Sequence, residues 1–185
     1  TSTTYSVSGT DVNGCVGTET LLISVVPLPT VNISPTNATV CSGSPATLTA
    51  NDALNYTWLP SGTIGSVTIE TPTILTTYTV IADNGGNCPT TATVDVNIYS
   101  LPTITASGTP TLICGGAPLT LTAGGAINYT WNPSAQTGSQ VVDNPTITTT
   151  YTVSGEDANG CVNTATWTAN VNPLPTITIT AVPQA

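Results

Sequence analysis

The residue types that carry most enzyme chemistry are scarce in this chain. The sequence has no Lys, no Arg and no His, and its nine acidic residues give a formal net charge of −9. A Ser or Cys nucleophile needs a neighbouring base, and general acid–base catalysis needs positioned titratable groups. Only Glu156 and Asp157 are adjacent acids, and they lie in turn-forming sequence. We therefore expect no catalytic residues and no enzymatic activity in this segment.

The acidic turns are the candidates for a metal site. Calcium prefers oxygen ligands from carboxylates, amides and carbonyls, and Asp, Glu and Asn gather in turns at 11–14, 83–87 and 156–160. The ligand set does not recur, however, because Asp157 aligns with Asn84. Paired cysteines without His or a C-x-x-C motif do not supply the usual zinc tetrahedron. We expect no metal and no cofactor, and bound calcium is the alternative left open.

Composition limits the class of partner. Without basic side chains the chain cannot neutralise phosphate, so it should bind neither nucleic acid nor anionic lipid. No apolar run approaches the roughly 20 residues of a membrane helix, so we expect no membrane insertion. The abundance of Thr, Val, Ile, Gly and Pro is typical of short strands separated by turns.

An internal repeat of 73 residues organises the whole sequence. Leu28-Pro29, Leu101-Pro102 and Leu174-Pro175 recur at this step, and residues 27–99 align without a gap on 100–172, with about half of the positions identical. We expect the last strands of a partial repeat at 1–26, complete repeats at 27–99 and 100–172, and the first strand of a further repeat at 173–185. Proline-rich joints between them should be short and semi-rigid.

Each complete repeat reads as a small all-β domain of about seven strands. Alternating apolar residues with frequent turn signals predict a β-sandwich. In the first complete repeat the predicted strands cover 30–34, 46–50, 55–58, 66–70, 76–82 and 91–98.

Aromatic residues mark the expected core of each repeat. Trp58 and Trp131, and likewise Tyr78 and Tyr151, are each 73 residues apart. A matched inward position on a strand favours a core anchor over an exposed sugar-binding platform. Trp167 stands where the preceding repeat has Val94, and we expect it to fill a gap in the interior.

The cysteines are also spaced by the repeat. Cys41 and Cys88 are separated by the same interval as Cys114 and Cys161. We expect each pair to form a disulfide that ties the turn after the first strand to the last hairpin. Cys15 is expected to be unpaired within these 185 residues, with its partner upstream. Such bridges would place the protein in an oxidising compartment.

The motifs resemble a known class of repeat. Cys-x-Gly-x-x-x-x-Leu-Thr-Ala at 41–50, Tyr-Thr-Trp-x-Pro at 56–60, Thr-Thr-Tyr-Thr-Val at 76–80 and Asp-Ala-Asn-Gly-Cys at 157–161 are similar to the immunoglobulin-like and PKD-like tandem repeats of large secreted and surface proteins of Bacteroidota. The resemblance implies an immunoglobulin-like fold with a tyrosine corner at Tyr78. It also implies a role in adhesins or gliding-associated filaments.

Two functions follow from this interpretation. The first is a structural segment of a long extracellular filament or stalk on the cell surface, with neighbouring repeats of the same chain as partners and lateral self-association into a fibre. The alternative is an adhesive array whose domains bind glycans or surfaces directly. Short proline joints and uniform domains favour the first.

Overall fold

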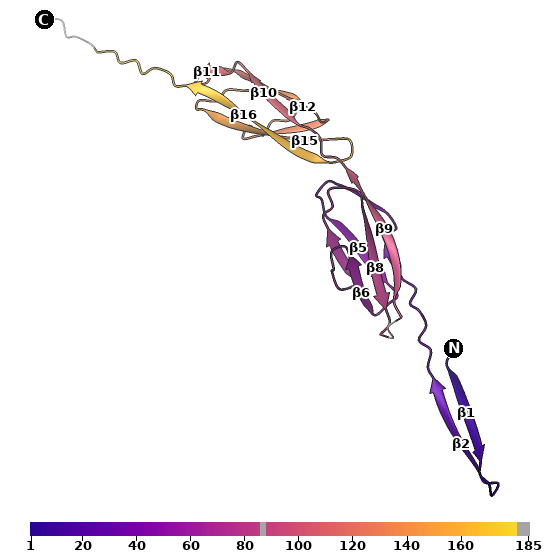
Figure 1. Ribbon diagram of the computed structural model, residues 1–185. Coiled ribbons are helices and arrows are strands. Elements are labelled where there is room, and N and C mark those ends of the chain that lie inside the picture. The colour runs from indigo at the N-terminus through magenta and orange to yellow at the C-terminus, as the bar shows by residue number, and fades with distance from the viewer. Residues whose placement is uncertain (86–87, 181–185) are drawn as a thin grey trace, which may run out of the picture. The chain divides into compact units, whose positions relative to one another are not determined.

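The computed structural model describes residues 1–85 and 88–180, and its regular elements there are all β-strands (Figure 1). The chain divides into two compact units, Thr1–Ile98 and Tyr99–Ala185. This division lies one residue before the boundary expected between repeats 27–99 and 100–172.

The first unit begins with a two-stranded hairpin. β1 (Thr3–Thr10) and β2 (Val16–Ile23) pair antiparallel from Thr3↔Ile23 to Thr10↔Val16. Every residue of both strands is exposed. Tyr5 is 59% exposed, whereas Tyr78, its equivalent in the next repeat, is 4% exposed. The hairpin therefore has the pattern of the last two strands of a sandwich, without the facing sheet that buries them.

The first complete repeat folds into two sheets that enclose a core. The three-stranded sheet has the order β3-β5-β7, and the four-stranded sheet has the order β4-β9-β8-β6. The strands of the first sheet are β3 (Asn32–Ser34), β5 (Ala46–Asn51) and β7 (Val67–Glu70). Those of the second are β4 (Ala38–Cys41), β6 (Asn55–Leu59), β8 (Thr76–Asp83) and β9 (Thr90–Tyr99).

The second complete repeat has the same architecture. Its sheets have the orders β10-β12-β14 and β11-β16-β15-β13. The first is built from β10 (Thr105–Thr109), β12 (Leu119–Gly124) and β14 (Gln140–Asp143). The second is built from β11 (Leu112–Cys114), β13 (Asn128–Asn132), β15 (Thr149–Glu156) and β16 (Val162–Asn172). In both repeats the first strand is split between the two sheets. This topology identifies immunoglobulin-like β-sandwiches with seven strands each.

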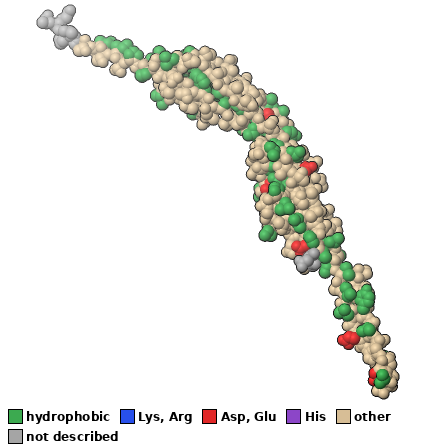
Figure 2. Space-filling model, viewed as in Figure 1, with side chains coloured by type: hydrophobic (Ala, Val, Ile, Leu, Met, Phe, Trp, Pro, Cys, Tyr) green, Lys and Arg blue, Asp and Glu red, His purple; other side chains and the backbone are tan. Residues whose placement is uncertain are grey.

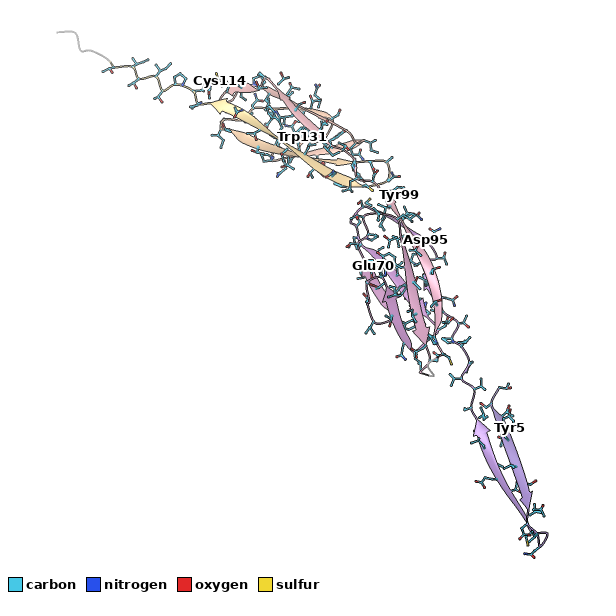
Figure 3. The ribbon with its side chains drawn as sticks, viewed as in Figure 1. Tyr5, Glu70, Asp95, Tyr99, Cys114 and Trp131 are labelled. Carbon is cyan, nitrogen blue, oxygen red and sulfur yellow. The ribbon has the colours of Figure 1, made fainter. Side chains whose placement is uncertain are left out.

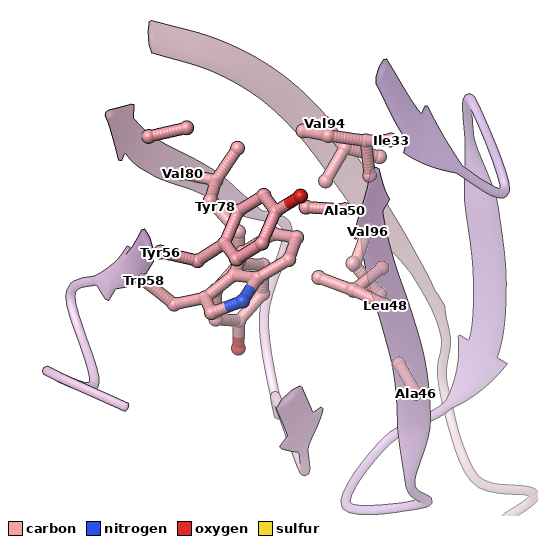
Figure 4. Close-up of a cluster of buried hydrophobic side chains, with 11 residues drawn as sticks. Ile33, Ala46, Leu48, Ala50, Tyr56, Trp58, Tyr78, Val80, Val94 and Val96 are labelled. Atoms are coloured by element: carbon pink, nitrogen blue, oxygen red, sulfur yellow. The ribbon is translucent and has the colours of Figure 1, made fainter. Parts of the chain in front are cut away.

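Alternation along the strands builds each core. In β8 the burial pattern changes at every residue, and it buries Tyr78, Val80 and Ala82, because successive side chains of a strand point to opposite faces. Figure 4 shows the rings of Trp58 and Tyr78 facing Leu48 and Ala50 from the opposite sheet. The second sandwich contains a matching cluster around Trp131, Leu121 and Val153.

Residues 173–180 form no strand, which differs from the first strand expected at 173–185; residues 181–185 lie outside the described part of the chain. In the complete repeats the equivalent strand pairs with a later strand of its own repeat, as β10 pairs with β12. In the described part of the chain, residues 173–180 are paired with no strand.

Candidate functional site

The tryptophans of β6 and β13 are interior residues. Trp58 and Trp131 are fully buried. The indole Nε1 of Trp58 donates to the carbonyl of Gly65 at 3.0 Å, and that of Trp131 donates to the carbonyl of Gly138 at 3.1 Å. A buried indole with its N–H satisfied is a packing anchor, so neither ring is available for stacking on a sugar.

Tyr56 and Tyr129 hold the turns that precede β6 and β13. Tyr56 donates its hydroxyl proton to the carbonyl of Ala53 at 2.8 Å and accepts the amide proton of Ala53 at 2.7 Å. Tyr129 makes the corresponding two bonds with Ala126, each at 2.6 Å. The interior hydrogen bonds therefore recur with the sequence repeat.

The tyrosines at the start of the next strand are buried too, at 4% exposure for Tyr78 and none for Tyr151. The Tyr151 hydroxyl donates to Asp143 Oδ2 at 2.6 Å. Burial, this hydrogen bond and the Asp143 charge raise the pKa of Tyr151 above its ordinary value. Burial and the Glu70 charge raise the pKa of Tyr78. These pairs stabilise the neutral phenol and are structural contacts.

Trp167 occupies space that the first sandwich fills differently. It is partly buried against the second core. A Cβ added to Gly108 would lie 2.5 Å from the ring carbons Cζ3 and Cη2 of Trp167. In the preceding repeat the equivalent residues are Pro35 and Val94. The large ring is thus accommodated by the absence of a side chain at Gly108, in agreement with the gap-filling role expected for it.

The acidic turns use their carboxylates to hold the backbone. Asp157 Oδ1 accepts the amide protons of Asn159 at 2.8 Å and Cys161 at 2.9 Å. Asp11 makes the same two contacts in the first hairpin, with Asn13 and Cys15. Within residues 1–85 and 88–180, no three His, Cys, Asp or Glu side chains cluster as a metal site.

The turn at 83–87 is built differently. Asp83 Oδ1 accepts from the Asn55 side-chain amide at 3.0 Å and from the Gly85 amide at 2.7 Å. The bond from Asn55, followed by that from Gly85, lowers the pKa of the Asp83 carboxyl. Gly86 and Asn87, which belong to the expected turn, lie outside the described residues.

The cysteines do not form the two pairs expected from their spacing. Cys88 and Cys114 are free, exposed thiols, as is Cys15, whereas Cys41 and Cys161 are disulfide-bonded. Each expected pair, Cys41–Cys88 and Cys114–Cys161, therefore contains one free member. The expectation of a bridge inside each repeat is corrected by this pattern.

Strand β11 gives the physical reason. It runs parallel to β16, and Cys114 is in register with Asn172, the last residue of that strand. Cys161 directly precedes Val162, the first residue of the strand. Ten steps of roughly 3.3 Å separate the two ends, whereas the Cα atoms of a disulfide lie within about 7 Å of each other. Figure 3 shows Cys114 beside the arrowhead of β16. The two cysteines of this repeat are at opposite ends of the sandwich.

The cysteines of the first complete repeat lie beside the equivalent strands. Cys41 ends β4, which borders β9, and Cys88 comes two residues before β9 begins. Strands β4 and β11 were missed in the sequence, where their residues were assigned to a turn. Few apolar residues indicate these two strands. β4 packs Ala38 and Val40 against the first core, and β11 packs Ile113 into the second.

The remaining titratable groups are dispersed. Figure 2 shows single acidic side chains scattered over the visible face, with no basic ones. The described residues include no helix long and apolar enough to cross a membrane.

Comparison with known proteins adds solved structures of low similarity. No protein-family model and no curated protein matches the chain. The eight-domain fragment of Down Syndrome Cell Adhesion Molecule is 15% identical over 94% of this chain and 27% of that one, with a TM-score of 0.42. The amphioxus IgVJ-C2 molecule is 14% identical over 72% of this chain and 99% of that one, with a TM-score of 0.33.

A bacterial structure also matches. The Yersinia pseudotuberculosis adhesin InvE is 15% identical over 77% of this chain and 59% of that one, with a TM-score of 0.27. These TM-scores are low, so the strand orders themselves, and not the likenesses, identify the fold as tandem immunoglobulin-like sandwiches.

Proposed function

We propose that this chain is a non-catalytic structural segment of a long extracellular array of immunoglobulin-like repeats. The observation that carries the proposal is the duplication of the interior. Both sandwiches have the same strand order, and the Trp-to-Gly and Tyr-to-Ala hydrogen bonds recur 73 residues apart. A protein that gains length by adding domains needs a unit that folds identically each time.

The exposed side chains support this assignment. The loops after β6 and β13 have the same backbone bridge, Thr57↔Ile64 in one and Thr130↔Thr137 in the other. Its exposed side chains change from Leu59 and Ile64 to Asn132 and Thr137. A binding site repeated in every domain would place similar side chains on the same backbone. The interior recurs here and this surface does not.

The proposed location is outside the cell, as a secreted or surface-attached protein. Disulfides persist mainly in oxidising compartments, and Cys41 and Cys161 are disulfide-bonded. The similarity of the motifs to repeats of Bacteroidota surface proteins agrees with this location. The partners we propose are neighbouring repeats of the same chain and, for a fibre, other copies of it. The acidic side chains are few, nine in 185 residues, so much of the surface carries no charge that would oppose such lateral contact.

Binding measurements separate this function from the adhesive alternative. The 185-residue chain is applied to an array of immobilised glycans and to inert surfaces, with the reduced, denatured chain as control. The structural function predicts no saturable binding beyond that control. Saturable binding that Leu59→Asn and Ile64→Thr together abolish, while circular dichroism stays unchanged, would show an adhesive site at this loop and overturn the proposal.

A further inference from the structure

An Asn-Gly peptide bond lies in each of the turns that follow β1, β8 and β15. The sequence contains three such bonds and no others, at Asn13-Gly14, Asn84-Gly85 and Asn159-Gly160. The three glycines have φ values of 83°, 81° and 78°, a conformation that residues with a side chain rarely adopt. These turns therefore require glycine here, whatever reaction the preceding asparagine makes possible.

Asn-Gly pairs are the sites where asparagine amides are lost most readily, because glycine has no side chain to hinder the attack. The glycine nitrogen gives its proton to hydroxide and attacks Cγ of the asparagine. A bond from this nitrogen to Cγ forms, the bond from Cγ to the side-chain nitrogen breaks, and ammonia leaves with a proton taken from water. Water then opens the cyclic imide on one side or the other, which gives aspartate or isoaspartate.

Two of the turns hold the glycine nitrogen by a backbone hydrogen bond. Gly14 N donates to the carbonyl oxygen of Asp11, and Gly160 N donates to that of Asp157, each at 3.1 Å. The carboxylates of the same aspartates accept the amide protons of the residues before and after the glycine. The proton that must leave is therefore held by an acceptor in a fixed turn, and this bond has to break before the nitrogen can attack.

The third turn holds both reacting groups by side-chain contacts. Gly85 N donates to Asp83 Oδ1 at 2.7 Å, and Asn84 Oδ1 accepts the amide proton of Leu54 at 3.1 Å. Leu54 lies outside this hairpin, in the turn between β5 and β6. The attacking nitrogen is therefore engaged, and the asparagine side chain is also fixed to another part of the sandwich.

We propose that Asn13, Asn84 and Asn159 are latent deamidation sites, which the aspartates of their turns protect in the folded protein. Attack requires an open turn, so protection should follow the support that each turn receives. Asn13 should be the least protected, because its hairpin is exposed along both strands and a lone two-stranded hairpin is marginally stable. Asn159 should be better protected by its sandwich, and Asn84, with its side chain fixed, should be protected best.

The reaction would change both the charge and the backbone of the turns. Each event replaces a neutral amide with a carboxylate, so three events would add three negative charges to the formal −9. Isoaspartate also lengthens the main chain by one carbon, because the backbone then runs through the former Cγ. These changes would weaken the turns and raise the repulsion between copies of the chain.

Peptide mapping after incubation tests the protection. The full chain is held at mildly alkaline pH in buffer and in guanidinium chloride, then reduced, alkylated and cut with a protease specific for Asp and Glu. The three asparagines fall in separate peptides, 12–19, 84–95 and 158–185, and mass spectrometry measures the conversion of amide to acid in each. For Asn84 we expect a rate at least about tenfold lower in buffer than in denaturant, the factor that one hydrogen bond to a charged acceptor provides.

Variants of one carboxylate show whether it carries the protection. Asp83→Ala removes the acceptor of the glycine proton and should raise the rate at Asn84 in buffer by about tenfold, with circular dichroism unchanged. Asp83→Asn keeps an acceptor oxygen and should retain most of the protection. The matched control is Asp95→Ala, because this carboxylate accepts from the hydroxyl of Thr77 and should leave the rate at Asn84 as it is.

Three results would overturn the proposal. Equal rates for Asn84 in buffer and in denaturant would show that the folded turn gives no protection. An unchanged rate in folded Asp83→Ala would show that the carboxylate plays no part, and a lower rate would show that it takes the glycine proton and promotes the reaction. Stronger protection of Asn13 than of Asn84 would contradict the order that the contacts predict.

Discussion

Replacing Gly108 by Ala tests how the second sandwich accommodates Trp167. The added Cβ would lie 2.5 Å from two ring carbons of Trp167 and 2.9 Å from a third, Cε3. Such a separation is well inside van der Waals contact, so the ring or the strand must move. Overpacking of this kind typically costs about 1–3 kcal/mol. In a domain of this size each kcal/mol lowers the melting temperature by about 4–8 °C.

A double-mutant cycle assigns the cost to this contact. Trp167→Val introduces the residue that the first repeat has at this position and removes the ring. In that background Gly108→Ala should lower the free energy of unfolding by less than about 0.5 kcal/mol, so the coupling energy between the two positions should be about 1–3 kcal/mol. Thermal unfolding of the four chains is followed by circular dichroism. Gly9→Ala is the control, because an added Cβ there has no neighbour within 4 Å.

Equal destabilisation by Gly108→Ala in both backgrounds would refute the packing argument. It would show that the cost arises from the backbone of β10 and not from the ring. A melting temperature unchanged by Gly108→Ala alone would refute it too, since it would mean that Trp167 moves without penalty.

Three further predictions concern the described contacts. The pKa of Tyr151 is raised in the folded protein, so the phenol holds its proton more tightly there than in the unfolded chain. The stability that this phenol contributes should be complete below about pH 10 and should fall as the pH rises further. Melting temperatures across this range should decline less steeply in Tyr151→Phe than in the unchanged protein. Asp157→Ala removes the acceptor of two turn amides and should destabilise the second sandwich by about 1–2 kcal/mol in denaturant titrations, whereas Asp157→Asn, which keeps the acceptor oxygen, should cost less. Trypsin should leave even the unfolded chain intact on a gel, because there is no Lys or Arg, while rapid digestion of the native oxidised chain by a broad-specificity protease would show that the sandwiches open readily.

Strand positions could be predicted from the sequence because periodicity and burial coincide. The strand expected at 46–50 is β5 (Ala46–Asn51), and that expected at 76–82 is β8 (Thr76–Asp83). The buried aromatic residues could be assigned because each recurs at the same step in an alternating context. The same pattern does not predict which sheet a strand joins, or whether it pairs parallel or antiparallel, because alternation is the same in both directions along a strand.

The disulfides show the consequence of that missing information. The spacing of Cys41 and Cys88 equals that of Cys114 and Cys161, but a spacing does not say at which end of a sandwich each cysteine lies. The deciding fact is the parallel pairing of Leu112↔Asn170 through Cys114↔Asn172, which carries this cysteine to the far end of β16. A strand of three residues is too short to show a recognisable alternation of apolar and polar side chains in the sequence.

Electron microscopy of the native protein that contains this segment tests the central claim most directly. We expect thin extracellular fibres or stalks with an axial period of one domain, on the order of a few tens of ångströms from strand rise and length. A short, globular native monomer of two or three domains would contradict the proposed function.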